Sequence, residues 1–292
     1  MFYEEPVFRP PSEANSLILQ ATTGCAHNAC AFCGMYKGKM FRVRSREEIQ
    51  RDINEAAAVT GGRVKRLFLA DGDVLAMETG DLLDLLSRLN RAFPYLERVA
   101  GYAGPRDLLA KTPAELSRLR KAGLQLLYLG VESGHDQILK KMAKGVDAAG
   151  MIRAGRAAIE AGFTLSVTVI TGLGGREQSL DHARATARVI NAINPHFLSA
   201  LTLMVLENTS LYHQIKAGKF TLLTPLESLR EIAWLLEDIN LSGCLFRSNH
   251  ASNYLPLKGK LNDDREKLLA LLKQAIKEPG RAGLRPEFLR GL

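Results

Sequence analysis

The sequence predicts an α/β fold: a partial (βα)6 barrel of the TIM type with a short C-terminal extension. Short runs rich in Val, Leu and Ile alternate six times with longer segments of helical periodicity, which is typical of βα units around a parallel sheet. Polar and glycine-containing motifs follow four of the predicted strands, where the chemistry of such barrels gathers. An open, doubly wound sheet fits the same alternation and is the competing arrangement.

The six predicted strands share an apolar, β-branched composition and are each followed by a turn and a helical segment. Two helix starts are marked by capping-box spacing, Ser45 with Glu48 and Thr112 with Glu115, in which each side chain satisfies a backbone N–H of the first turn. The strands are expected at Leu17–Ala21, Val64–Ala70, Leu96–Tyr102, Leu124–Val131, Phe163–Thr171 and Phe197–Leu203.

This pattern divides the chain into three parts. Residues 1–14 form an N-terminal extension, residues 15–205 the (βα)6 core, and residues 206–292 a C-terminal extension that we expect to cover the barrel mouth. Within this extension, an apolar patch at Gly243–Phe246 predicts a further edge strand, and Asp263–Lys277 reads as an amphipathic helix.

The composition is that of a globular protein, with 46% hydrophobic and 24% charged residues in 292. The formal net charge of +8 favours an anionic partner, such as nucleic acid, a phosphorylated or polycarboxylate substrate, or an acidic electron-donor protein. The first residues include Glu4, Glu5 and Arg9 and do not resemble a signal peptide, and no apolar run approaches the ~20 residues that span a bilayer. We therefore expect a cytoplasmic protein with no membrane contact.

Three of the four cysteines form one motif after the first predicted strand. Cys25, Cys30 and Cys33 have the spacing Cys-x4-Cys-x2-Cys, with no fourth cysteine nearby. Structural zinc sites and electron-transfer [4Fe–4S] clusters use four protein ligands, whereas three thiolates leave one iron of a cluster open. An open iron can bind the amino and carboxylate groups of a methionine moiety and place its sulfonium beside a one-electron reductant. The alternative is a zinc site that adds His27 to the three cysteines.

The cysteine loop resembles that of the radical S-adenosylmethionine (SAM) superfamily. The usual spacing there is Cys-x3-Cys-x2-Cys with an aromatic residue before the last cysteine; Phe32 takes this place, and the first gap is one residue longer. From Cys25 to about Gly175 the chain is similar to the branch of oxygen-independent coproporphyrinogen oxidase, methylthiotransferases and elongator-type enzymes. The resemblance implies a [4Fe–4S] cluster on the three cysteines and cleavage of SAM to a 5′-deoxyadenosyl radical, which abstracts hydrogen from a substrate.

The resemblance also implies cofactor contacts after the second strand. Asp71, Gly72 and Asp73 stand where the family carries a glycine-rich segment that binds the amino group of the methionine moiety. Gly72 retains the glycine pattern, and Asp71 or Asp73 could accept hydrogen bonds from the ammonium group. A simple turn that ends the strand is the alternative interpretation.

Further implied contacts follow the fourth and fifth strands. In the motif Gly-Val-Glu-Ser-Gly, which contains Glu132 and Ser133, the resemblance assigns Glu132 to the ribose hydroxyls. Lys144, one helix later, is assigned to the methionine carboxylate, with a solvated helix face as the alternative. Gly172 lies in the glycine turn after the fifth strand, where the family's backbone approaches the adenine; glycine permits close approach and a positive φ.

A dense polar run in the C-terminal third is a candidate substrate surface. Arg247 can hold a carboxylate or phosphate, and His250 can exchange protons near neutral pH. Asn249, Ser252 and Asn253 complete the candidate set. The alternative is a hydrogen-bonded loop in which these side chains satisfy their own backbone.

These motifs favour a radical SAM enzyme, an oxidoreductase or transferase, whose substrate is a small molecule or RNA. Its reductant would be a donor protein such as flavodoxin or ferredoxin. The lone Cys244 reads as a small core residue or, alternatively, as a thiol hydrogen donor. The competing function is a zinc-containing nucleic-acid-binding module, and no catalytic side chain beyond the cofactor site is predicted.

Overall fold

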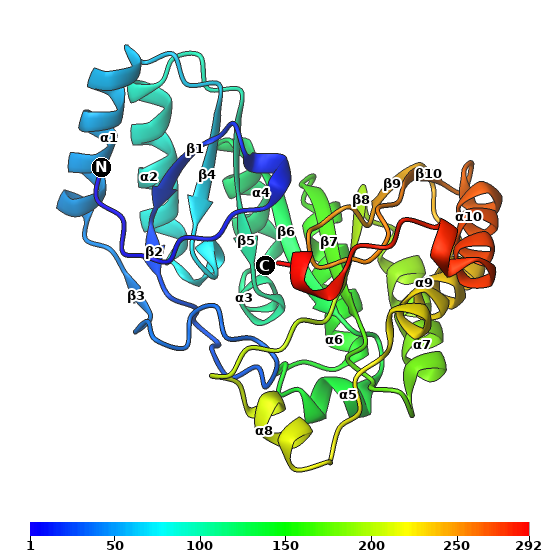
Figure 1. The fold of residues 1–292 in the computed structure, drawn as a ribbon. Coiled ribbons are helices and arrows are strands. Elements are labelled where there is room, and N and C mark those ends of the chain that lie inside the picture. Colours follow the sequence, from blue (N-terminus) through cyan, green and yellow to red (C-terminus); the bar gives the residue numbers. More distant parts are fainter. Residues whose placement is uncertain (292) are drawn as a thin grey trace. The chain divides into compact units, whose positions relative to one another are not determined.

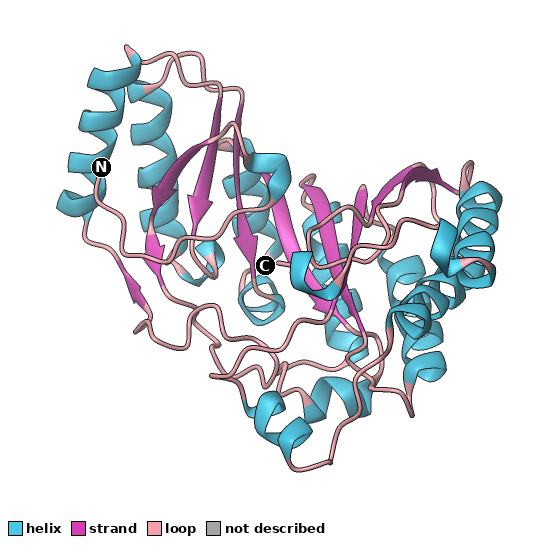
Figure 2. Ribbon diagram, viewed as in Figure 1, coloured by secondary structure: helices cyan, strands magenta, loops and turns pink. Residues whose placement is uncertain are grey.

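The protein is an α/β structure in which helices alternate with the strands of a mostly parallel sheet (Figures 1 and 2). The computed structural model describes residues 1–291. The strand order is β1-β4-β5-β6-β7-β8-β9-β10. These strands are β1 (Leu17–Gln20), β4 (Arg66–Ala70), β5 (Arg98–Ala103), β6 (Leu124–Glu132), β7 (Thr164–Thr171), β8 (Phe197–Thr202), β9 (Cys244–Arg247) and β10 (Lys258–Leu261).

The strand order confirms the predicted fold class. Each successive strand of the large sheet is added beside the one before it, as in a singly wound βα barrel, whereas a doubly wound sheet reverses direction at a switch point. The six predicted strands correspond to β1, β4, β5, β6, β7 and β8, with ends that differ by at most two residues.

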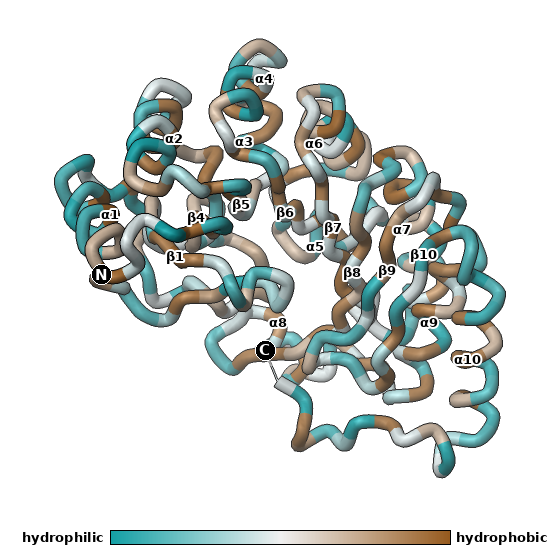
Figure 3. Tube along the Cα trace, turned by 90° about the horizontal axis from the view of Figure 1, so that it is seen from above, coloured by the Kyte–Doolittle hydropathy of each residue, from teal (hydrophilic) through white to brown (hydrophobic). Residues whose placement is uncertain are grey.

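The helices are amphipathic, and Figure 3 shows hydrophilic and hydrophobic segments following one another along their turns. Both predicted capping boxes are present, at the starts of α1 and α4. The helices are α1 (Arg46–Thr60), α2 (Thr79–Ala92), α3 (Pro105–Ala110), α4 (Pro113–Lys121), α5 (Asp136–Lys141), α6 (Ala148–Glu160), α7 (Ser179–Ile193), α8 (Ser210–Lys216), α9 (Pro225–Asp238) and α10 (Arg265–Lys277), with short 3-10 turns η1 (Pro11–Glu13), η2 (Val74–Ala76), η3 (Pro279–Arg281) and η4 (Glu287–Leu289). Within the described part of the chain, none of them combines the length and apolar character that crossing a membrane requires.

Four short strands depart from the sequence expectation. The patch at Gly243–Phe246 does form a strand, β9, but the prediction of an edge strand was wrong, because β9 lies between β8 and the antiparallel β10. β10 was not predicted because Lys258–Leu261 is short and largely polar. A separate two-stranded sheet joins β2 (Thr22–Thr23) to β3 (Arg42–Val43) and brackets the cysteine loop.

The chain forms two compact units. The first contains Met1–Asn28, Met35–Leu129 and Arg156–Leu165; the second contains Ala29–Gly34, Gly130–Gly155 and the residues from Ser166 onward. The cysteine loop is therefore divided, with Cys25 in the first unit and Cys30 and Cys33 in the second. The division into an N-terminal extension, a core and a C-terminal extension at residues 14 and 205 remains a prediction.

Strand β4 of the first unit is buried on both faces. Leu67 and Leu69 point to one side of the sheet, and Phe68 points to the other, where it meets Tyr102 and Tyr128 edge-on at centroid distances of 5.1 and 6.0 Å. Burial of both faces is characteristic of parallel sheets and explains why the sequence shows unbroken apolar runs.

A buried carboxylate joins η1 to the strands of this unit. Glu13 accepts hydrogen bonds from the Tyr128 hydroxyl at 2.6 Å and from the Arg98 guanidinium at 2.7 Å. The buried polar group is thus paired and hydrogen-bonded, as burial of a charge requires.

Candidate cofactor-binding site

In the first unit, the buried carboxylate of Asp71 fastens both ends of the cysteine loop to the end of β4. It accepts hydrogen bonds from the backbone N–H of Gly24 at 2.8 Å, from Nζ of Lys39 at 3.1 Å and from Nε2 of Gln20 at 3.1 Å. Gly24 precedes the first cysteine, and Lys39 lies where the chain returns towards β3. Asp71 itself has a left-handed backbone (φ 67°), a conformation that persists only where its surroundings enforce it.

Gly72 allows the cysteine loop to lie directly on the turn after β4. Its N–H donates to the carbonyl of Gly24 at 2.8 Å. A Cβ at this position would lie 2.7 Å from both Cα and Cβ of Cys25, closer than real side chains approach. Because Gly72 has no side chain, Cys25 can lie directly against this turn.

Asp73 is also occupied by protein partners. Its carboxyl accepts the N–H groups of Leu75 at 2.9 Å and Gly104 at 2.7 Å. Burial, together with the hydrogen bond to Asp107 and the charge of that residue, holds the pKa of Asp73 well above its usual range, against the lowering effect of the two N–H donors. The Asp73 side chain is therefore engaged with Leu75, Gly104 and Asp107 of the protein itself.

Consequently, Asp71 and Asp73 use their side-chain oxygens to shape the turn after β4. The predicted contact with the ammonium group of SAM stays a prediction for both residues. Gly72 is the member of the motif with a direct geometric tie to a predicted cluster ligand.

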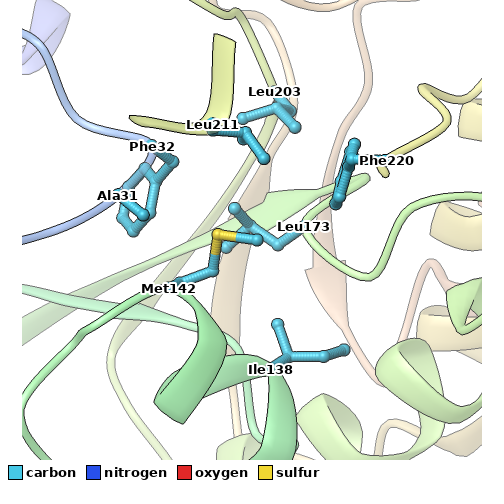
Figure 4. Close-up of a cluster of buried hydrophobic side chains, with 8 residues drawn as sticks. All are labelled: Ala31, Phe32, Ile138, Met142, Leu173, Leu203, Leu211 and Phe220. Atoms are coloured by element: carbon cyan, nitrogen blue, oxygen red, sulfur yellow. The ribbon is translucent and has the colours of Figure 1, made fainter. Parts of the chain in front are cut away.

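In the second unit, the other half of the cysteine loop is anchored by a hydrophobic cluster (Figure 4). The ring of Phe32 is buried there, and Cys30 and Cys33, on either side of it in sequence, pack against the same cluster while remaining partly exposed. The aromatic residue before the last cysteine thus acts as an anchor for the loop. The cluster comprises Ala31, Phe32, Ile138, Met142, Leu173, Leu203, Leu211 and Phe220.

Backbone hydrogen bonds fix the same segment. Ala31 donates to the carbonyl of Met142 at 2.9 Å and accepts from the N–H of Leu211 at 2.9 Å. The carbonyl of Gly34 accepts from the side-chain amide of Asn208 at 3.1 Å. Segments from α5 and from the start of α8 therefore hold the loop on both sides of Phe32.

Glu132 and Lys144, both predicted cofactor residues, lie together at the end of β6. Oε1 of Glu132 accepts from Nζ of Lys144 at 3.1 Å, whereas Oε2 is buried with no hydrogen-bond partner among residues 1–291. Glu132 has a left-handed backbone (φ 64°), and a Cβ on Gly130 would meet its Oε1 at 2.1 Å. The strand end is thus shaped around the Glu132 carboxylate, and a buried acceptor without a donor is costly.

Lys144 is electrostatically linked to two cysteines as well as to Glu132. Burial alone lowers the pKa of its ammonium, but the charges of Glu132, Cys30 and Cys33 and the hydrogen bond to Glu132 outweigh burial, and the net pKa is raised. Lys144 is therefore a largely buried cation near Cys30 and Cys33, not a residue of a solvated helix face.

The turns after β6 and β7 are held by residues that no sequence motif marks. The N–H of Gly134, which follows the buried Ser133, donates to the Thr186 hydroxyl of α7 at 3.0 Å. The N–H of Gly172 donates to the buried carboxylate of Glu231 on α9 at 2.7 Å. Both partners lie more than 50 residues away in sequence, and no local spacing signals them.

The predicted substrate run separates into a structural and an exposed part. Asn253 is buried, accepts from the Thr202 hydroxyl and donates to the Ala200 carbonyl, both at 2.9 Å. Ser252 is also buried and hydrogen-bonds Nδ1 of His250 at 2.9 Å. Burial, then the charge of Arg285, lowers the pKa of His250, so its neutral form is favoured.

Arg247 and Asn249 are exposed. They are the members of the run with side chains accessible to a substrate, while Ser252 and Asn253 fit the hydrogen-bonded-loop interpretation. A substrate role for the five residues stays a prediction.

Cys244 behaves as a core residue. It is fully buried, and burial raises the pKa of its thiol to about 12. A thiol that is neither exposed nor ionised near neutral pH fits the packing interpretation.

The donors present fit the cofactors that the sequence implies. Four cysteines lie in the described residues and none forms a disulfide, so the three motif thiols are available as ligands. Glu132 offers an unsatisfied buried oxygen for a hydroxyl donor. Within residues 1–291, no three His, Cys, Asp or Glu side chains form a group that could hold a single metal ion. A [4Fe–4S] cluster makes a different demand, because each thiolate binds a different iron.

Comparison with known proteins decides the family. A model described as the radical SAM superfamily matches residues 19–190, which is more than half of the chain. The chain belongs to the radical SAM superfamily. Members of this superfamily are iron–sulfur enzymes that use a [4Fe–4S] cluster and SAM.

Two curated relatives of this radical SAM chain match over a limited length. The heme chaperone HemW of Bacillus subtilis is 25% identical over 177 residues, covering 59% of this chain and 45% of the relative. A putative methylthiotransferase of Methanocaldococcus jannaschii is 28% identical over 143 residues, covering 45% of this chain and 30% of the relative. The chain thus spans less than half the length of these relatives.

Solved structures show the same fold. Coproporphyrinogen III oxidase (HemN) from Escherichia coli superimposes with a TM-score of 0.56 at 21% identity, covering 76% of this chain and 52% of that one. Methylornithine synthase (PylB) gives a TM-score of 0.54 at 18% identity, with coverage of 78% and 64%. At these identities the likeness shows the fold alone.

Replacement of Asp71 by Ala should cost about 3–5 kcal/mol of unfolding free energy, because it leaves the buried Lys39 ammonium without its carboxylate. The double variant Asp71→Ala/Lys39→Met should lose less than the sum of the two single variants, since it removes both charges. Equilibrium urea unfolding of the four proteins measures this coupling. Additive losses would show that the ion pair does not hold the loop.

Gly72→Ala should cost about 1–3 kcal/mol of stability by overpacking and should lower the iron content of anaerobically reconstituted protein, because the new methyl group displaces Cys25. Gly80→Ala is the matched control: Gly80 lies in the first turn of α2 with open space around it. Iron analysis and visible absorbance measure both variants. Wild-type iron content in Gly72→Ala would contradict the assigned contact.

Proposed function

We propose that the protein is a radical SAM enzyme in which Cys25, Cys30 and Cys33 hold a [4Fe–4S] cluster with one iron open to SAM. When bound, the cluster and SAM supply reductive cleavage to methionine and a 5′-deoxyadenosyl radical, which abstracts hydrogen from an organic substrate. The observation that carries the proposal is the three-thiol motif within the region that matches the superfamily. The match also favours this function over a zinc-containing nucleic-acid module.

The residues around the motif have separable roles in this proposal. Gly72 and Asp71 position Cys25, and Phe32 anchors the segment that carries Cys30 and Cys33. Oε2 of Glu132 accepts a hydrogen bond from a ribose hydroxyl, since that oxygen is buried and has no donor within the described residues. Ser133 and the Gly172 turn complete the nucleoside contacts.

Lys144 neutralises negative charge near Cys30 and Cys33. Its ammonium is already paired with Glu132, and its raised pKa keeps it cationic. It can therefore attract the methionine carboxylate while it orients Glu132, which combines the two predicted assignments in one ion pair.

The electron is proposed to come from a reducing donor protein such as flavodoxin or ferredoxin. The formal net charge of +8 suits an acidic partner. A reducing compartment, the cytoplasm, is proposed because the described cysteines form no disulfide. The substrate class, a small molecule or RNA, is decided by experiment: we expect substrate-dependent consumption of SAM with either total RNA or a small-molecule extract.

The test is reductive SAM cleavage by anaerobically reconstituted protein. Wild type with a strong reductant should release 5′-deoxyadenosine and methionine, and Cys25→Ala/Cys30→Ala/Cys33→Ala should release neither. The matched control is Cys244→Ala, which removes the one cysteine outside the motif and should keep iron and cleavage. Cleavage by the triple variant at the wild-type rate, or a purified protein that holds zinc and no iron, would refute the proposal.

A further inference from the structure

Glu231 brings three donors from two distant segments to one buried carboxylate. It lies on α9, is 1% exposed, and accepts the N–H of Gly172 at 2.7 Å and Nδ1 of His182 at 2.9 Å. The hydroxyl of Ser179 donates to its second oxygen. Helices α7 and α9 lie side by side (Figure 1). This packing brings Glu231 on α9 to the turn after β7.

The hydrogen bond to Gly172 constrains an unusual piece of backbone. Gly172 follows β7 with φ 90°, a conformation that side-chain-bearing residues rarely adopt. Glycine in a turn can rotate between several conformations, and the buried carboxylate selects the one in which its N–H points towards α9. A hydrogen bond to a charged acceptor is stronger than a neutral one.

His182 keeps the carboxylate in place. Its Nδ1 bonds Glu231, while its Nε2 is buried and has no hydrogen-bond partner within the described part of the chain. A small cavity of about 10 Å³ adjoins the ring, bordered by Thr171, Thr186, Glu231 and apolar side chains. This space is close to what one water molecule needs, and a water there would satisfy Nε2.

The same helix also holds the turn after β6. Thr186, one turn beyond His182 on α7, accepts the N–H of Gly134, and a Cβ on Gly134 would lie 2.3 Å from the carbonyl oxygen of Ala185. Helix α7 therefore touches one of the proposed nucleoside-binding turns directly and reaches the other through Glu231.

We propose that Glu231 is a positioning residue for cofactor binding: with His182 and Ser179 it fixes the Gly172 turn in the conformation that receives the adenosyl group of SAM. This inference rests on the proposed function. It makes α9, outside the region that matches the superfamily model, part of the framework of the cofactor site.

The test is the affinity for SAM of anaerobically reconstituted Glu231→Gln. Glutamine keeps the volume but removes the charge and replaces one acceptor oxygen by an NH2 group. We expect about tenfold weaker SAM binding, the effect of losing one charge-assisted hydrogen bond. Binding is read from the change in the electron paramagnetic resonance signal of the reduced cluster as SAM is added.

The matched control is Glu237→Gln, which removes the same charge from an exposed position of α9. It should bind SAM like wild type. The signal without SAM and the iron content should be unchanged in both variants, which separates positioning from a general loss of structure. Wild-type SAM affinity in Glu231→Gln would overturn the inference.

If wild type itself shows no SAM-dependent change, the proposed function fails and not the role of Glu231 alone. If Glu231→Gln does not fold, Ser179→Ala decides: we expect about threefold weaker SAM binding from the loss of one hydroxyl donor, and unchanged affinity would overturn the inference.

Discussion

The structure around Cys25 depends on one buried carboxylate. Asp71 holds the loop at Gly24, where it leaves the sheet, and at Lys39, where it returns, and it does so from a left-handed backbone at the end of β4. A buried acid of this kind is stable only with its partners in place, because an unpaired ion in the interior costs several kcal/mol. Folding of this unit and closure of the loop are therefore coupled.

A glycine and a buried aromatic ring also position the cysteines. Gly72 lets Cys25 approach the turn after β4, and Phe32 places Cys30 and Cys33 against the hydrophobic cluster of the second unit. Glu132 and Lys144 supply a charged pair beside those two cysteines. The longer gap between the first two cysteines lies where the chain passes from the first unit to the second.

The strands and the site motifs could be predicted, but most of their partners could not. Strands β1 and β4–β8 are rich in apolar residues, which local sequence reveals, whereas β10 is short and polar. Asp71 and Gly172 follow strands and Glu132 ends one, and the resemblance to the radical SAM superfamily singled out these positions as candidates. Lys39 and Glu231 act over sequence separations of 32 and 59 residues, through contacts that only the folded chain creates. The hydrogen bonds of Asn253 to Thr202 and Ala200 on β8 could not be predicted for the same reason.

The proposed function requires that the three cysteines leave one iron open for the amino and carboxylate groups of SAM. Electron–nuclear double resonance on the reduced protein, with SAM labelled with ¹⁵N and ¹⁷O in its methionine moiety, tests this most directly. We expect coupling from both labels to the cluster, and its loss in Cys25→Ala. A cluster signal without coupling to either label, in protein that binds SAM, would contradict the account.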